Sequence, residues 1–228
     1  MFEAILFDFD GTLVDFVASD IQSLKCLHTH INSSVCFDDF LNTSVDEIMS
    51  FHRLVAEHKI DPLVMHKFRL QNTFSRHNLA WDDEYVDFYQ DKLLKTCTPF
   101  NGVEKLLSGV KQKVKTGLIT NAYDGQEQGE RIRSSGLEIY FDLIVIAGDI
   151  GLYKPDISIF LYALNRLNVA PDRALYVGDS IKYDIVGAKA AGMKTTLFSK
   201  QSNRDCNVAD YNVKGIDELQ ALFDRVIV

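Results

Sequence analysis

Two acidic residues follow a short apolar run near the start of this 228-residue chain. Asp8 and Asp10 stand in the segment DFDGTLVD, directly after the run Ala4–Phe7. Two carboxylates at the end of a buried strand are costly unless a proton or a cation neutralises them, and a hard divalent cation bound by oxygens would do so. Gly11 permits a tight turn after them. A surface turn rich in Asp and Gly would give the same letters, so this segment alone only indicates a metal or acid–base site.

A second acidic segment, GDSIKYD, follows the apolar run Ala174–Val177. Asp179 stands where that strand would end, so it could complete a magnesium site. Asp184 comes five residues later, about one helical turn away, and could face the same site.

Two further segments add a hydroxyl group and a positive charge. Thr120 and Asn121 end LITN, and a hydroxyl with backbone N–H groups at a strand-to-helix junction suits phosphate oxygens. A plain helix N-cap would explain them equally well. Lys154 stands in YKPD, before Pro155, a residue that suits the first turn of a helix. That lysine could offset the carboxylates and hold a phosphate as a point charge, or be a solvated surface residue.

Each of the four segments overlaps or follows the end of a short apolar run that reads as a buried strand. Short runs alternating with helical patterns predict a parallel sheet covered on both faces, here a Rossmann-like doubly wound α/β core. The carboxyl ends of parallel strands meet at one crevice, so segments far apart in sequence can form one site. The five predicted strands are Ala4–Phe7, Thr116–Ile119, Leu143–Ile146, Ala174–Val177 and Thr195–Phe198.

Residues 16–96 break this alternation and predict an inserted α-helical cap domain. Apolar residues recur there at three- and four-residue spacing, which is typical of amphipathic helices. The sheet domain would then comprise residues 1–15 and 97–228, and Pro99–Gly102 would form the turn by which the chain re-enters it. The four predicted helices run from Val17 to Ile31, Val45 to Val55, Val64 to Phe74 and Tyr85 to Leu93.

The composition is that of an ordinary globular protein, with 46% hydrophobic and 25% charged residues. A net charge of −8 argues against nucleic acid and anionic membranes as partners, since both need a basic face. No apolar run approaches the roughly 20 residues that span a bilayer, and the N-terminus shows no secretory signal. We therefore expect a cytoplasmic protein. Its cysteines match no metal or redox pattern and are expected to be reduced thiols: Cys26, Cys36, Cys97 and Cys206.

Taken together and in order, DFDGTLVD, LITN, YKPD and GDSIKYD resemble the motifs of the haloacid dehalogenase superfamily. The resemblance covers essentially the whole chain and extends to the helical cap of its phosphatase branch. The chain is most similar to pyrimidine 5′-nucleotidase-like and phosphoglycolate phosphatase-like members, and the stretch from Thr120 to Lys154 is most similar to the nucleotidase-like ones. Ala122 departs from that pattern, because the nucleotidase group often has glycine after the Thr-Asn pair.

The resemblance implies a reaction through a phospho-aspartate. Asp8 would attack phosphorus as the nucleophile, and Asp10 would act as general acid and then as general base. Mg²⁺ would be held by Asp8, Asp179 and Asp10, the last through its backbone carbonyl.

The remaining motif residues would bind the substrate or support the metal ligands. Thr120 and Lys154 would bind the phosphoryl oxygens, with Asn121 beside them on the substrate side. Asp184 would orient waters and the lysine, and Thr12 would support the metal ligands without binding the metal itself.

These implications predict a Mg²⁺-dependent phosphatase acting on a small-molecule phosphomonoester, with nucleoside monophosphates favoured on the Thr120–Lys154 stretch alone. A sugar-phosphate mutase would use the same motifs, and a non-catalytic binding module is a further alternative. A dehalogenase would have no need of Asp10. The inserted cap of roughly 80 residues after the first motif would cover the site and favour small substrates over phosphoproteins. The oligomeric state stays open. Candidate substrate contacts in the cap are His52, Arg53, Lys67, Arg69 and Arg76.

Overall fold

The computed structural model describes residues 1–199 and 207–227 of the chain. It divides into two compact units: Met1–Phe16 with Thr98–Val228, here called the sheet unit, and Val17–Cys97, here called the helical unit. Among the described residues, no helix combines the length and the apolar character needed to cross a bilayer. Of the four cysteines, Cys206 lies outside the described residues, and the other three are free thiols.

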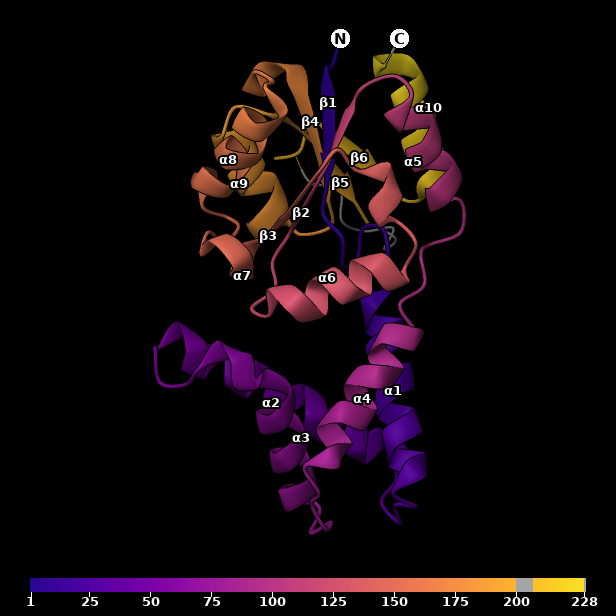
Figure 1. The fold of residues 1–228 in the computed structure, drawn as a ribbon, viewed down its shortest axis with the longest axis vertical. Helices are drawn as coiled ribbons and strands as arrows, with labels where there is room; N and C mark the ends of the chain where they lie inside the picture. Colours follow the sequence, from indigo (N-terminus) through magenta and orange to yellow (C-terminus); the bar gives the residue numbers. More distant parts are fainter. Residues whose placement is uncertain (200–206, 228) are drawn as a thin grey trace. The chain divides into compact units, whose positions relative to one another are not determined.

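The sheet unit is built on a six-stranded sheet in which every neighbouring pair is parallel, in the order β3-β2-β1-β4-β5-β6 (Figure 1). The predicted doubly wound α/β fold is therefore confirmed. The sixth strand was not predicted, because it has only three residues and one buried side chain. The strands are β1 (Ala4–Phe7), β2 (Lys115–Thr120), β3 (Leu143–Ile146), β4 (Ala174–Gly178), β5 (Lys194–Phe198) and β6 (Tyr211–Val213).

Helices cover both faces of this sheet, with α8 and α9 on one side and α5 and α10 on the other (Figure 1). This arrangement explains why the strands read as continuous apolar runs rather than as alternating ones. The helices are α5 (Val103–Lys111), α6 (Gly125–Ser134), α7 (Ala147–Ile150), α8 (Ile157–Leu167), α9 (Val186–Ala190) and α10 (Ile216–Val226).

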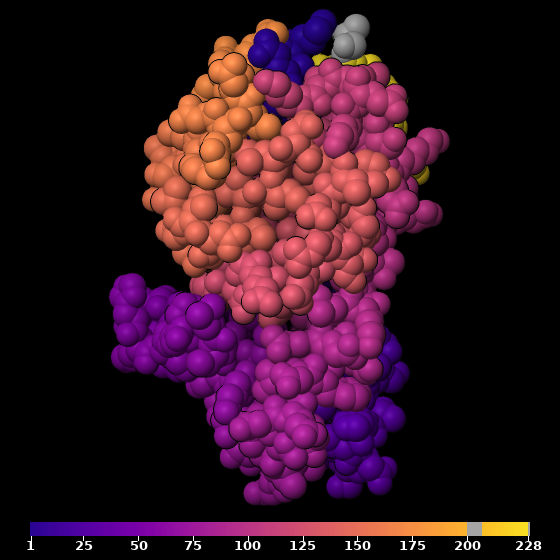
Figure 2. Space-filling view, in the orientation of Figure 1, coloured from indigo at the N-terminus to yellow at the C-terminus, as the bar shows by residue number. Residues whose placement is uncertain are grey.

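The central strand β1 is buried on both faces. Successive side chains of a strand point to opposite faces. Ala4 and Leu6 accordingly join the apolar cluster that includes Phe160 of α8, whereas Phe7 packs edge-on against Phe223 of α10, with ring centroids 6.0 Å apart. The residues of this strand are fully buried, and in the space-filling view later segments of the sheet unit cover it (Figure 2).

The strand register sets which polar residues meet at the carboxyl edge of the sheet. Phe7 pairs with Leu118 of β2 on one side and with Val177 of β4 on the other. The residues that follow these three positions therefore emerge side by side at one edge. The register thus brings Asp8, Thr120 and Asp179, which end or follow these three strands, to the same edge of the sheet.

The helical unit consists of α1 to α4, and the four predicted helices are all present. The second is longer than predicted, because it begins eight residues earlier, at Phe37, where polar residues interrupt the apolar spacing. The helices are α1 (Phe16–His30), α2 (Phe37–Ala56), α3 (Met65–Arg76) and α4 (Glu84–Lys95).

A buried ion pair joins all four of these helices. Arg69 of α3 is 1% exposed and donates two hydrogen bonds of 2.9 Å to the carboxylate of Asp20 in α1. It also donates to the backbone carbonyl of Ser44 in α2, and Tyr89 of α4 donates to Asp20 at 2.6 Å. The sequence-based suggestion that Arg69 contacts substrate is therefore replaced by a structural role, since its guanidinium is already used inside the unit.

We expect Arg69→Met to destabilise the protein by about 3–5 kcal/mol, because it leaves the largely buried carboxylate of Asp20 without its cation. The matched control is Lys67→Met on the same helix, whose ion pair with Asp83 is exposed, and it should change the free energy of unfolding far less than Arg69→Met does. Urea denaturation of both variants gives the comparison. Equal effects of the two substitutions would contradict this role for Arg69.

Candidate active site

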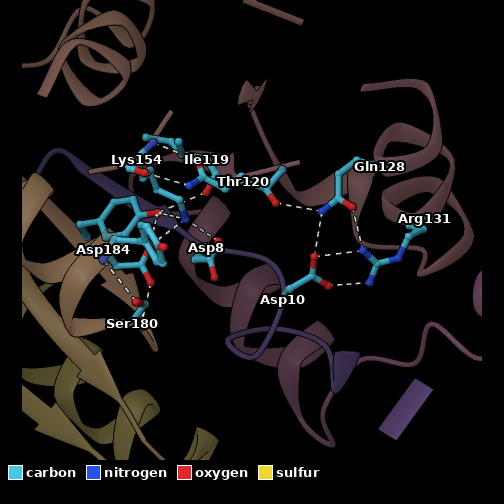
Figure 3. A network of polar contacts seen from close by, with 12 residues as sticks. Asp8, Asp10, Ile119, Thr120, Gln128, Arg131, Lys154, Ser180 and Asp184 are labelled. Carbon is cyan, nitrogen blue, oxygen red and sulfur yellow. Dashed lines mark hydrogen bonds and ion pairs between the residues drawn. The ribbon is translucent and has the colours of Figure 1, made fainter. Parts of the chain in front are cut away.

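A buried lysine links two of the motif carboxylates. Asp8 follows β1, and its backbone N–H donates to the carbonyl of Val177 at 2.9 Å. The ammonium of Lys154 lies 2.6 Å from Oδ1 of Asp8 and 2.7 Å from Oδ1 of Asp184, and the lysine is only 4% exposed (Figure 3). Burial alone would lower the pKa of Lys154, but the two carboxylates raise it well above its usual value, so the lysine stays charged.

The backbone of Lys154 is held by Asn121. The carboxamide of Asn121 donates to the lysine carbonyl and accepts from the lysine N–H, each at 2.9 Å. The side chain predicted to bind substrate is therefore occupied by the main chain of the loop before α8. The sequence analysis placed Pro155 in the first turn of that helix, and this was wrong. Pro155 precedes the helix, because Asp156 is its N-cap and accepts from the N–H of Ser158 at 2.8 Å.

Asp184 is placed by a π-helical turn, Ile181–Ile185, that follows β4. Its Oδ2 accepts from the N–H of Ser180 at 2.9 Å, while Oδ1 receives the lysine. A side chain at Gly178 is excluded, because an added Cβ would lie 2.4 Å from Cγ of Asp184. Both oxygens of Asp184 thus have protein partners, which suits a residue that orients its neighbours.

A tyrosine that the sequence analysis did not single out completes this cluster. Tyr176 lies in β4, fully buried, and its hydroxyl accepts from the Lys154 ammonium at 3.2 Å and donates to the carbonyl of Ile119 at 3.2 Å. The available signal was a phenol inside an apolar strand, since a buried hydroxyl requires a hydrogen-bond partner.

Three carboxylates form a group that suits a divalent cation. One oxygen each from Asp8, Asp179 and Asp184 lie within 4.8 Å of one another. Asp179 reaches this position across Gly11, which has φ +81° and where an added Cβ would come within 2.6 Å of the Asp179 carboxylate. Burial raises the pKa of Asp179 to about 6, and the charge of Asp184 adds to this. Carboxylates that resist ionisation in this way are stabilised by a hard cation with oxygen ligands, so the residues fit such an ion.

The side chain of Asp10 turns away from these carboxylates toward α6 (Figure 3). Arg131 donates to both of its oxygens, at 2.5 and 3.0 Å, and Gln128 donates to Oδ2 at 3.0 Å. The amide of Gln128 also donates to the hydroxyl of Thr120 at 2.8 Å. The predicted phosphate-binding threonine and the predicted acid–base residue thus share one hydrogen-bond network.

Sequence reasoning missed both Gln128 and Arg131. The available signal was their three-residue spacing in a helix directly after LITN, which places both on one face of α6. Thr120 itself is not the N-cap of that helix, because Asp124 fills this position by accepting from the N–H of Glu127 at 3.0 Å.

Thr12, predicted to support the metal ligands, is fully buried in the turn after Asp10. Its hydroxyl makes no hydrogen bond within the described residues. Its role in supporting the metal ligands therefore stays a prediction.

Comparisons with known proteins agree with these motifs. The haloacid dehalogenase-like hydrolase family matches residues 5–198. N-acylneuraminate-9-phosphatase of Mus musculus is 34% identical over 98% of this chain and 94% of its own length. Pyrimidine 5′-nucleotidase YjjG of Escherichia coli is 39% identical over 57% of this chain and 59% of its own length. The magnesium-bound structure of the putative hydrolase YfnB from Bacillus subtilis covers 98% of this chain and 99% of its own, at 23% identity and a TM-score of 0.83.

We expect Asp179→Asn to raise the thermal midpoint of the metal-free protein by about 2–4 °C, because it removes one of three crowded carboxylates. The same change should abolish the rise in midpoint that Mg²⁺ produces in the unchanged protein. Asp172→Asn, at an exposed position before the same strand, is the matched control and should retain that rise. A full Mg²⁺ response in the Asp179 variant would show that this carboxylate is no ligand.

Proposed function

Because the chain belongs to the haloacid dehalogenase-like hydrolase family, we propose that it is a Mg²⁺-dependent phosphatase of small-molecule phosphomonoesters. The observation that carries the proposal is the buried carboxylate of Asp8, oriented by the charged Lys154 beside a group of acids that suits a cation. Phosphatase names among relatives that cover most of the chain support the same reaction class.

The proposed reaction has two halves. In the first, a carboxylate oxygen of Asp8 forms a bond to phosphorus while the bond from phosphorus to the ester oxygen breaks, and Asp10 gives that oxygen its proton. In the second, the oxygen of a water molecule forms a bond to phosphorus while the bond from phosphorus to the Asp8 oxygen breaks, and Asp10 takes a proton from that water. Inorganic phosphate leaves, and both aspartates return to their starting state.

The chain's own residues supply most of what this reaction needs. Oδ1 of Asp8 is held by Lys154, which leaves Oδ2 as the attacking atom. The same ammonium and the hydroxyl of Thr120 would bind phosphoryl oxygens. Phosphoryl transfer depends mainly on such alignment and on positive charge near those oxygens.

Mg²⁺ would be held by Asp8, by Asp179 and by the backbone carbonyl of Asp10. When bound, it would neutralise charge on the phosphoryl oxygens. Asp184 is better suited to orienting Lys154, since both of its oxygens already have partners.

We expect Asp8→Asn to lower phosphate release at least about a thousandfold, because an amide is a poor nucleophile and a poor magnesium ligand. Near-unchanged far-UV circular dichroism would show that the fold is retained. Acid quenching with a ³²P-labelled ester should leave label on the unchanged protein and none on the variant. Normal turnover by the purified variant would contradict the mechanism.

For the substrate, we propose a soluble phosphomonoester such as a nucleoside monophosphate or a phosphorylated sugar acid. The first rests on the 39% identity to the pyrimidine 5′-nucleotidase, and the second on the N-acylneuraminate-9-phosphatases that align over 98% of the chain. A sugar-phosphate mutase would use the same aspartates, and it would yield an isomerised ester in place of inorganic phosphate.

We expect a panel assay with Mg²⁺ to show kcat/KM at least about a hundredfold higher for a nucleoside monophosphate or N-acylneuraminate 9-phosphate than for a phosphopeptide. Phosphoglycolate and glyceraldehyde 3-phosphate complete the panel, and excess EDTA provides the metal-free control. Efficient phosphopeptide hydrolysis would contradict the small-molecule assignment. Detection of an isomerised ester would favour the mutase.

A further inference from the structure

Two side chains of α6 contact both residues that flank the nucleophile in the proposed site. Gln128 and Arg131 are each only 3% exposed. Together they donate three hydrogen bonds to the carboxylate of Asp10, and Gln128 donates a fourth to the hydroxyl of Thr120 (Figure 3). An ion pair that only tied the helix to the sheet would not need to reach both of these groups.

The direction of every bond in this network follows from the arginine. A guanidinium can only donate, so the 2.7 Å contact between Arg131 and Gln128 requires the amide oxygen Oε1 to face the arginine. The amide nitrogen Nε2 must then face Thr120 and Asp10, to which it donates at 2.8 and 3.0 Å. Because the oxygen of Thr120 accepts this bond, its own proton is directed elsewhere and can be given to a phosphoryl oxygen.

The arginine is well suited to fix this arrangement. Its guanidinium carbon lies 5.6 Å from the ring centre of Phe9, within the segment DFDGTLVD, and 4.8 Å from that of Phe16, which follows the segment. A planar group held on aromatic rings and bound to both oxygens of a carboxylate has little freedom to rotate. Asp10 therefore has a defined orientation before any substrate is bound.

We propose that Arg131 and Gln128 are a positioning pair that acts on two reacting groups at once. They hold the carboxylate of Asp10 in one defined position before it takes part in proton transfer, and they direct the hydroxyl of Thr120 for phosphate binding. The inference rests on the proposed phosphatase function and extends it to two residues outside the motifs. It assigns separate consequences to each partner. Loss of the arginine should harm proton transfer to the leaving group, whereas loss of the glutamine should also weaken phosphate binding.

The first test compares leaving groups. An alkyl phosphate needs a proton on its leaving oxygen, whereas p-nitrophenyl phosphate scarcely does. Arg131→Met should lower kcat/KM for the alkyl ester roughly a hundredfold. For the nitrophenyl ester the loss in kcat/KM should be about tenfold or smaller. Arg131→Lys retains the charge but loses the bidentate contact with Asp10. Its kcat/KM for the alkyl ester should lie between the values of the unchanged protein and of Arg131→Met. Equal losses on both esters would overturn the positioning role.

Matched controls come from the same helix. Gln126→Met and Arg133→Met change the same residue types at exposed positions of α6. Both should leave kcat/KM for the two esters within about twofold of the unchanged protein, since exposed substitutions have small effects. A leaving-group effect in these controls as large as in Arg131→Met would also overturn the proposal.

The second test does not need turnover. Calorimetric titration with inorganic phosphate in the presence of Mg²⁺ should show roughly fivefold weaker binding for Gln128→Met, because the hydroxyl of Thr120 loses its fixed direction. In a Thr120→Val background the glutamine substitution should cause no further loss. Additive losses would show that Gln128 does not act through Thr120.

The outcomes separate this inference from the function on which it rests. Suppose that the unchanged protein releases phosphate normally, but that the Arg131 and Gln128 variants show equal losses of kcat/KM for both esters. The proposed function then stands, and the positioning role is wrong. If the unchanged protein neither cleaves any phosphomonoester nor binds inorganic phosphate, both the proposed function and the positioning role are wrong. Arg131→Lys and the titration cover the case in which Arg131→Met does not fold.

Discussion

The ammonium group of Lys154, buried between the carboxylates of Asp8 and Asp184, is the interaction on which the rest of the site depends. Without a cation there, the carboxylates of Asp8 and Asp184 would be buried close together with no positive partner, which is strongly unfavourable. The lysine in turn needs its own supports. Asn121 holds its backbone, and Tyr176 receives its third donor.

A second cation serves the other motif acid in the same way. Arg131 is to Asp10 what Lys154 is to Asp8, so each aspartate proposed to react has its own buried positive partner. Asp179 has no cation of this kind among the described ion pairs, and burial together with the charge of Asp184 raises its pKa to about 6. The negative charge left in the group is what a bound divalent cation would balance.

The parallel sheet makes these pairings possible. Asp8 stands between the ends of β2 and β4 because Phe7 pairs with Leu118 and Val177. Glycine then allows close approach where two motif segments meet: Gly178 leaves room for Asp184, as Gly11 does for Asp179. Backbone register and two glycines therefore allow acids from distant segments to come within reach of one ion.

The sequence by itself determined the fold class, five of the six strands, the four helices of the inserted unit and the strand-end positions of the motif residues. These depend on hydrophobic periodicity and on local order along the chain. Only the tertiary structure decided that Asn121 holds a backbone, that Asp10 faces Arg131 and Gln128, and that Arg69 is paired inside the helical unit. The physical reason is that polar groups choose partners by distance and direction across elements, and a pattern of residue types records neither.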